Sequence, residues 1–172
     1  EGMFDITTAY ASELWNFTGE EHHVPTEEEL KTAVSKTGYE NIKIDGNMVT
    51  LTGDVTEIDL GGIGKGYVGD KAREYLVENG VTKAIINLGG NILTVQPEDS
   101  EYFSIGIQEP FGEQNAIYGT VAIKNKTVVT SGIYERYFEE NGKLYHHILN
   151  PFTASPIENY LYFVSIIADS SV

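Results

Sequence analysis

The stretch Asp59-Leu60-Gly61-Gly62-Ile63-Gly64-Lys65-Gly66-Tyr67-Val68-Gly69-Asp70 carries the main evidence for the fold. Residues 55–60 alternate like a short strand, and the apolar residues after Tyr67 recur on one face of a helix that ends at Gly80. A strand that runs into glycines and opens a helix presents unpaired N–H groups to an anion, and glycine lets the backbone approach a phosphate closely. We therefore expect an anion-binding loop, whose candidate binding residues are Gly61, Gly62, Lys65 and Gly66.

The same stretch allows other interpretations. Gly64-x-Gly66-x-x-Gly69 matches the dinucleotide fingerprint, which is weak evidence by itself. A nicotinamide dehydrogenase would need a parallel βαβ sheet and an acidic residue at the end of the second strand, where this chain has Asn87-Leu88. In the remaining alternative, the glycines only pack a helix against a sheet and Lys65 stays in solvent.

The rest of the chain predicts an α+β fold with a mostly antiparallel sheet and a few packed helices. Asp5 or Thr7 can cap a short helix, and a capping box from Thr26 to Glu29 predicts a second helix that reaches about Lys36. Hairpin turns are predicted at 45–47 and 141–142. Further strands are expected at residues 83–88, 92–96, 102–108, 118–124, 128–130 and 163–168. No linker is visible, so we expect one domain over residues 1–172.

Composition narrows the function classes. The 172 residues contain 11 Lys+Arg against 26 Asp+Glu, for a formal net charge of −15, so nucleic acid is a poor partner. The chain has no cysteine, which excludes disulfides, thiolate metal sites and a cysteine nucleophile. No apolar run is long enough to cross a bilayer.

A second candidate site lies on the hairpin that turns at Asn141-Gly142. A two-residue turn places Arg136 opposite His147, on a face that also carries aromatic side chains. Either residue alone would be read as structural, the histidine as a satisfied core residue and the arginine as a surface side chain. Their pairing makes Arg136 and His147 our catalytic candidates, and we interpret His146, on the other face, as structural or solvated.

Two turn-like segments flank this hairpin, residues 130–132 before it and residues 150–156 after it. Both are expected to place hydroxyl groups near His147. No Gly-x-Ser-x-Gly elbow accompanies them, which argues against a hydrolase triad.

Five segments in register resemble the ApbE family of flavin transferases. They are Phe4-Asp5-Ile6-Thr7 with Leu14-Trp15-Asn16-Phe17, Asp59 to Tyr67, Asn87-Leu88-Gly89-Gly90-Asn91, Thr130 to Phe138, and His146-His147-Ile148-Leu149-Asn150-Pro151. The resemblance implies T-fold-like layers and Mg²⁺-dependent transfer of FMN from FAD to a threonine of an acceptor protein, with release of AMP. Its alternatives are hydrolysis of FAD to FMN and AMP, or flavin binding without turnover.

The resemblance also implies roles for individual residues. Lys65 and the backbone of residues 61–66 would hold the diphosphate, and His147 would act as a general base or phosphate partner, with Arg136 supporting charge. Thr130, Ser131, Tyr134 and Thr153 would line the FAD cleft. Mg²⁺ would bind the backbone carbonyl of Gly64 and side chains beyond Val172.

Further implications concern the whole protein. The resemblance implies an exported enzyme on the extracytoplasmic face of the bacterial cell membrane, attached only through an upstream lipid anchor. We expect residues 1–172 to be a catalytic core fragment that lacks the N-terminal and C-terminal parts of the family domain and is inactive alone. The sequence departs from the family pattern at Tyr10, Gly64, Asn150 and Ala154, where the family tends to have Pro, Ala, Asp and Gly.

Overall fold

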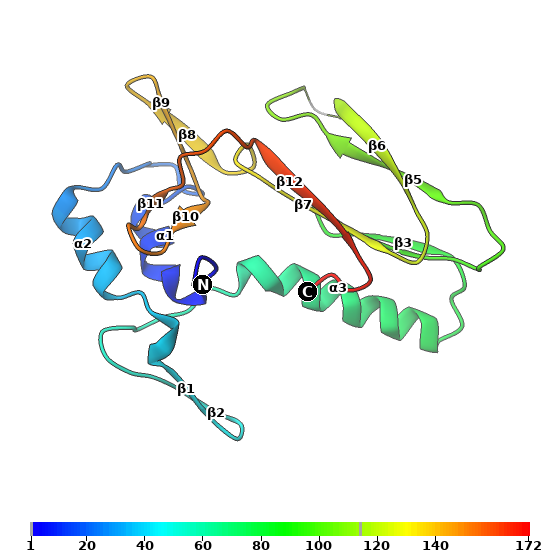
Figure 1. Cartoon of the computed structure of the whole chain (residues 1–172), viewed down its shortest axis with the longest axis horizontal. Coiled ribbons are helices and arrows are strands. Elements are labelled where there is room, and N and C mark those ends of the chain that lie inside the picture. Colours follow the sequence, from blue (N-terminus) through cyan, green and yellow to red (C-terminus); the bar gives the residue numbers. More distant parts are fainter. Residues whose placement is uncertain (1, 114) are drawn as a thin grey trace. The chain divides into compact units, whose positions relative to one another are not determined.

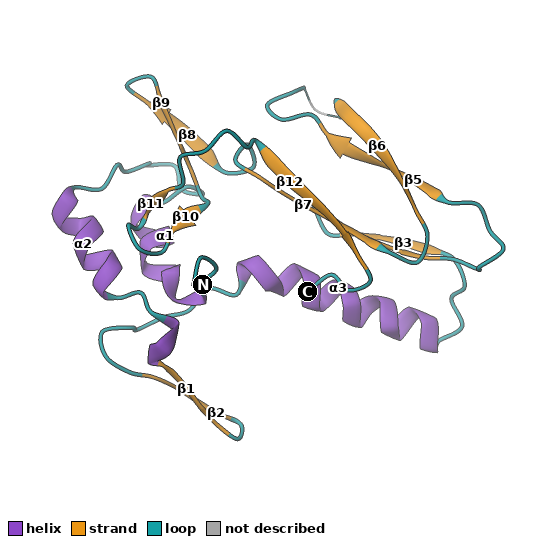
Figure 2. Ribbon diagram, viewed as in Figure 1, coloured by secondary structure: helices purple, strands orange, loops and turns teal. Residues whose placement is uncertain are grey.

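The computed structural model describes residues 2–113 and 115–172, and contacts within the chain divide it into two compact units (Figures 1 and 2). Unit 1 comprises Glu1–Leu60 and Ile133–Tyr160, and unit 2 comprises Gly61–Gly132 and Leu161–Val172. Helices combine with antiparallel strand pairs in the structure, which confirms the predicted α+β class. The expectation that residues 1–172 form one domain stays a prediction.

Unit 1 combines short helices with three hairpins. Its elements are η1 (Ile6–Thr8), α1 (Ala9–Trp15), α2 (Glu27–Ser35), η2 (Tyr39–Asn41), β1 (Ile42–Asp45), β2 (Met48–Leu51), β8 (Tyr137–Glu140), β9 (Lys143–His146), β10 (Leu149–Asn150) and β11 (Ser155–Pro156). The strand pairs are β1–β2, β8–β9 and β10–β11, all antiparallel.

Local sequence signals explain the ends of these elements. Asp5 caps η1 by accepting the Thr7 N–H, and Thr26 and Glu29 form the predicted capping box of α2. Both residues of the β8–β9 turn are left-handed, with φ 53° at Asn141 and 76° at Gly142. This conformation suits the two-residue hairpin that the Asn-Gly pair predicts.

Aromatic packing forms one core of unit 1. Trp15, Phe17 and Phe138 are buried together, and the Trp15 ring stacks on Phe17 at a centroid distance of 5.6 Å. The indole N–H donates to the backbone carbonyl of Ala154 at 2.7 Å. This bond ties α1 to the turn between β10 and β11, where Ala154 adopts a left-handed φ of 54°. A glycine would adopt that conformation more readily, which accounts for the glycine expected there in the family pattern.

Unit 2 is a layered α/β arrangement. Its elements are α3 (Gly61–Glu78), β3 (Ala84–Asn87), β4 (Asn91–Val95), β5 (Phe103–Gln108), β6 (Ile117–Ile123), β7 (Thr127–Gly132) and β12 (Phe163–Ala168). Four strands form an antiparallel sheet in the order β12-β7-β4-β3, with β12 at one edge. The β5–β6 hairpin contributes Ile105, Ile107 and Ile123 to a core that includes Val128 of β7. On the sheet's other face, α3 lies along the sheet (Figure 2). Gly69 of α3 meets Leu93 of β4 there.

The structure corrects three local predictions. Residues 55–60 do not form a strand. Val55 is buried, and the Asp59 N–H donates to the Ile6 carbonyl at 2.7 Å, but this hydrogen bond is not part of a strand pairing. The glycines after Leu60 are not a loop, because α3 begins at Gly61. Residues 130–132 are not a turn, because β7 extends through Gly132 and pairs with β12.

None of the helices among the described residues has the length and apolar character needed to cross a membrane.

Candidate functional site

The β3–β4 turn of unit 2 brings together several of the predicted binding residues. Gly89 and Gly90 form this turn with φ values of 65° and 73°, a conformation that favours glycine. The Lys65 ammonium group donates to the Gly89 carbonyl at 3.1 Å, and the Thr130 N–H donates to the Gly90 carbonyl at 2.7 Å. Three segments far apart in the sequence therefore meet at one turn.

The N-terminal end of α3 is suited to an anion. The first N–H groups of a helix have no partners within the helix, and their partial positive charge attracts anions. The first turn of α3 contains no acidic residue, and Lys65 follows it. A Cβ added to Gly64 would meet no atom within 4 Å, so the backbone here is approachable. Because a helix terminus contributes on the order of 1 kcal/mol, further positive groups are needed to hold a diphosphate.

The remaining glycines of this segment pack the helix. A Cβ on Gly66 would collide with the backbone carbonyl of Ser171, and a Cβ on Gly69 would lie 2.7 Å from the Leu93 side chain. Both glycines are buried. Their burial supports the packing interpretation for these two positions, whereas Lys65 contacts the Gly89 turn.

The dehydrogenase alternative is wrong for this fold. Every strand pair among the described residues is antiparallel, so the parallel βαβ unit that the fingerprint requires is not formed there. The glycines of the Gly64-x-Gly66-x-x-Gly69 pattern lie within α3 itself rather than in a loop before a helix.

The two catalytic candidates lie at the open end of the β8–β9 hairpin in unit 1. The predicted register is confirmed, since Tyr137 pairs with His146 and Glu140 with Lys143. One step beyond the strands, the His147 N–H donates to the Arg136 carbonyl at 3.1 Å, and His147 Nδ1 lies 3.3 Å from the same oxygen. Arg136 is exposed and His147 is half-buried, so solvent reaches both.

The neighbouring predicted residues also belong to unit 1. Burial raises the pKa of the half-buried Tyr134 phenol, and the charge of Glu135 adds to that effect. Thr153 lies in the β10–β11 turn, where its N–H donates to the Asn150 carbonyl at 3.1 Å. The side chain of Asn150 accepts the Phe152 N–H at 2.9 Å, which holds the turn without the negative charge of an aspartate.

The predicted site residues are thus divided between the two units. Unit 2 holds Gly61, Gly62, Gly64, Lys65, Gly66, Thr130 and Ser131, and unit 1 holds Tyr134, Arg136, His147 and Thr153. Within unit 2, the Thr130 hydroxyl lies 2.7 Å from that of Ser165 on β12, and Ser131 is exposed. The roles assigned to these residues stay predictions.

His146, which we interpreted as structural or solvated, is buried and hydrogen-bonded. The ring is 6% exposed, Nε2 lies 3.0 Å from the Ile157 carbonyl, and Nδ1 accepts the Ile148 N–H at 3.3 Å. An acceptor at Nδ1 and a donor at Nε2 describe a neutral imidazole. Desolvation lowers the pKa of His146, and the hydrogen bond to Ile157 only partly opposes it.

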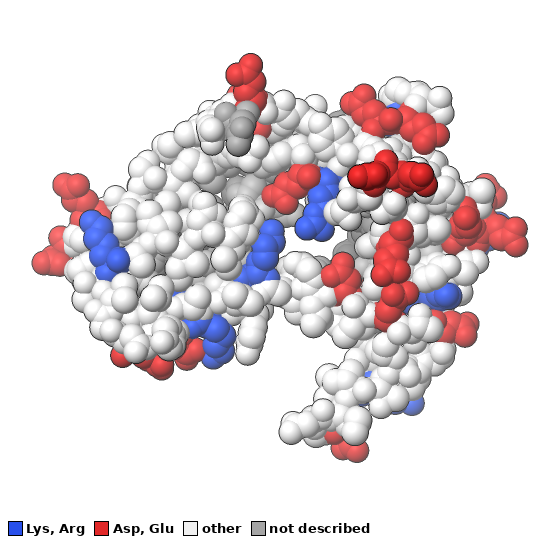
Figure 3. Space-filling model, turned by 180° about the vertical axis from the view of Figure 1, so that it is seen from behind, with Lys and Arg blue, Asp and Glu red and all other residues white. Residues whose placement is uncertain are grey.

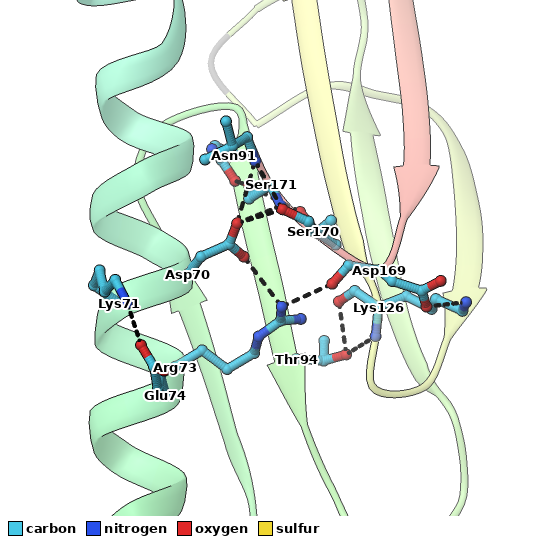
Figure 4. A network of polar contacts seen from close by, with 12 residues as sticks. Asp70, Lys71, Arg73, Glu74, Asn91, Thr94, Lys126, Asp169, Ser170 and Ser171 are labelled. Atoms are coloured by element: carbon cyan, nitrogen blue, oxygen red, sulfur yellow. Dashed lines mark hydrogen bonds and ion pairs between the residues drawn. The ribbon is translucent and has the colours of Figure 1, made fainter. Parts of the chain in front are cut away.

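A polar network around Asp70 was missed by the sequence analysis (Figure 4). Asp70 Oδ2 accepts hydrogen bonds from the Ser170 hydroxyl at 2.7 Å, the Ser171 N–H at 2.8 Å and the Val172 N–H at 3.2 Å. Arg73 donates to Asp70 Oδ1 at 3.1 Å and to the Asp169 carbonyl at 2.7 Å. Burial alone would raise the pKa of Asp70, but these hydrogen bonds and the Arg73 charge hold it below its usual value.

Unit 2 also contains a cavity, which borders the polar network through Asp70, Arg73 and Ser170. Its volume is about 910 Å³, and it lies beside the C-terminal half of α3, between Val77, Val81, Val95 and Gln96. None of the residues predicted for the site lines it. The cavity is therefore not the candidate site.

The described residues contain no cluster of acidic or histidine side chains of the kind that holds a metal ion. No group of three or more His, Asp or Glu side chains among residues 2–113 and 115–172 is arranged to hold a metal ion. The Asp169 carboxylate pairs with the Lys126 ammonium group instead. Acidic side chains are scattered over the face shown in Figure 3 rather than gathered at one place. We therefore derive no catalytic step through Mg²⁺.

Comparisons with known proteins agree with this architecture. The model of the ApbE family matches residues 1–172. An ApbE protein from Thermotoga maritima superimposes with a TM-score of 0.89 at 37% identity, covering 99% of this chain and 56% of that one. The Pseudomonas stutzeri flavinyl transferase ApbE gives 0.81 at 30% identity, covering 99% and 53%. An FAD:protein FMN transferase from Klebsiella pneumoniae is 36% identical over 174 residues, 100% of this chain and 54% of the relative. The chain spans about half the length of these relatives.

Proposed function

Because the chain belongs to the ApbE family, we propose that residues 1–172 form part of an enzyme that transfers FMN from FAD to a threonine of an acceptor protein. The names of the relatives support flavin transfer. The observation that carries the proposal to this chain is the meeting of Lys65, Thr130 and the Gly89–Gly90 turn beside the N-terminal end of α3. The Lys65 ammonium group supplies a cation, and the first N–H groups of α3 supply backbone donors for a diphosphate.

The proposed reaction breaks the phosphoanhydride bond of FAD. The threonine oxygen attacks the phosphorus of the FMN half, AMP leaves with the bridging oxygen, and the threonine proton passes to a base. Charge neutralisation and in-line positioning account for most of the catalysis in such transfers. We assign Lys65 to the diphosphate and His147 to the proton or a phosphate oxygen, with Arg136 adding positive charge.

The proposal extends to the setting of the enzyme. We place it on the extracytoplasmic face of a bacterial membrane, held by a lipid anchor, with Mg²⁺ as a required ion. The family resemblance supports these points, and the residues described here would contribute to Mg²⁺ only the Gly64 carbonyl.

A chimera tests the proposed transfer. Residues 1–172 would replace the matching half of the Thermotoga maritima protein, and the product would be incubated with FAD, MgCl₂ and a threonine-containing acceptor. We expect mass spectrometry to show FMN attached to the acceptor and chromatography to show AMP. Release of AMP together with free FMN would show that the protein hydrolyses FAD instead of transferring FMN. Binding of FAD without release of AMP would indicate a flavin-binding protein.

A further inference from the structure

The segment that follows β12 runs along α3 in the opposite direction to the helix. Asp169 meets Arg73, Ser170 and Ser171 meet Asp70, and the Ser171 carbonyl lies against Gly66. The contacts therefore move from the middle of α3 towards its N-terminal end. That direction leads to Lys65 and the open backbone at Gly64.

The Asp70 carboxylate holds this segment through several bonds at once. Its two oxygens accept from two backbone N–H groups, one hydroxyl and one guanidinium. Hydrogen bonds to a charged group are stronger than neutral ones. The Asp70 side chain is 21% exposed and that of Arg73 is 22% exposed, so water screens these bonds only partly.

The sheet holds the same segment from the other side. The Ser171 side chain is buried and donates to Asn91 Oδ1 at 2.5 Å (Figure 4). Its hydroxyl also lies 3.1 Å from the Thr127 hydroxyl. Gly66 lets the two backbones approach, because any side chain there would collide with Ser171. Residues 169–172 are therefore fixed between α3 and the strands β4 and β7.

We propose that residues 170–172 form a wall of the FAD diphosphate site and that Asp70 is the positioning residue that holds this wall in place. The proposal rests on the function proposed above. Asp70 touches neither reactant; it acts through Ser171 and Val172, which it binds, and through Gly66, beside Lys65. This role differs from that of Lys65, whose charge would contact the diphosphate directly.

Asp70→Asn in the chimera tests the role, because it keeps the size of the side chain but removes the charge and one acceptor oxygen. We expect the amide hydrogens of Ser171 and Val172 to lose protection from exchange and the Kd for FAD to rise about tenfold. Asp70→Glu, which retains the carboxylate, should restore part of the affinity. Glu74→Gln is the matched control, because it removes one charge from a half-exposed carboxylate on the same helix that pairs with Lys71 instead of residues 169–172.

The outcomes separate this inference from the proposed function. If the Asp70→Asn chimera loses amide-exchange protection at Ser171 and Val172 but keeps its Kd for FAD, residues 170–172 are not a wall of the diphosphate site. This conclusion would hold even if the chimera transfers FMN. A wild-type chimera that binds no FAD would overturn both proposals. If Asp70→Asn does not fold, Ser170→Ala removes one hydrogen bond at an exposed residue, and an unchanged Kd with weakened protection would likewise count against the wall.

Discussion

Lys65 is the residue to which we assign the FAD diphosphate in the proposed site. Its ammonium group is held at the Gly89 carbonyl, beside the first turn of α3. In the chimera, Lys65→Ala should raise the Kd for FAD by about tenfold, because the diphosphate loses a nearby positive charge. Fluorescence titration measures the change, which should shrink at high salt as the ions screen the charge.

Lys71→Ala provides the matched control for that measurement. Lys71 lies on the same helix and pairs with Glu74 at 2.6 Å. Its loss removes the same charge from the chain, so an equal rise in Kd for both variants would show a general electrostatic effect rather than a site at Lys65.

His146 gives unit 1 a dependence on pH. Its folded-state pKa is lowered from 6.5 because the ring is desolvated. The unfolded chain therefore binds the proton more readily, and the free energy of unfolding should decrease as pH falls below about 6.5 and level off below the lowered pKa. Urea unfolding across this range measures the effect. His146→Gln should flatten this limb of the profile, and a limb that keeps its slope in this variant would contradict the prediction.

At the scale of elements, the N-terminus of α2 offers a test of local stability. Thr26 and Glu29 exchange hydrogen bonds at 3.3 Å and 2.8 Å. Thr26→Ala removes the hydroxyl acceptor and should lower the free energy of unfolding by about 1 kcal/mol. Thr32→Ala in the same helix is the control, because its hydroxyl only bonds back to the Glu28 carbonyl. Equal losses from both variants, measured by thermal unfolding, would contradict the cap.

Elements set by local chemistry could be predicted from the sequence. The Asn141-Gly142 turn and the α2 capping box each depend on a few adjacent residues, and both are confirmed. Of the two predicted caps, Asp5 and Thr7, it is Asp5 that caps η1. Residues 55–60 show the limit, because an alternating pattern does not reveal whether a partner strand exists. The start of α3 was missed for a related reason: glycines favour loops, and a contact such as that of Gly66 with Ser171 becomes visible only in the fold.

At the scale of the whole molecule, one part of the candidate site could be predicted from the sequence and another part could not. Phosphate binding by the motif residues of unit 2 stays a prediction, although the structure brings Lys65, Thr130 and the Gly89–Gly90 turn together. The Asp70 contacts could not be predicted, because they join α3 to a segment that follows the last strand of the sheet. The composition shows a net charge of −15, but it does not show where the few positive side chains lie in the fold.

The edge strand β12 has a consequence for handling this protein. Among the described strands it pairs only with β7, and its sequence Phe163 to Ala168 carries no charge and no proline. Val164 and Ile166 are about half exposed, at 48% and 59%. Such an edge is a template for pairing with another chain. Residues 1–172 alone should therefore self-associate with rising concentration in light scattering, and Ile166→Lys should suppress it, whereas a wild-type chain that stays monomeric would contradict this expectation.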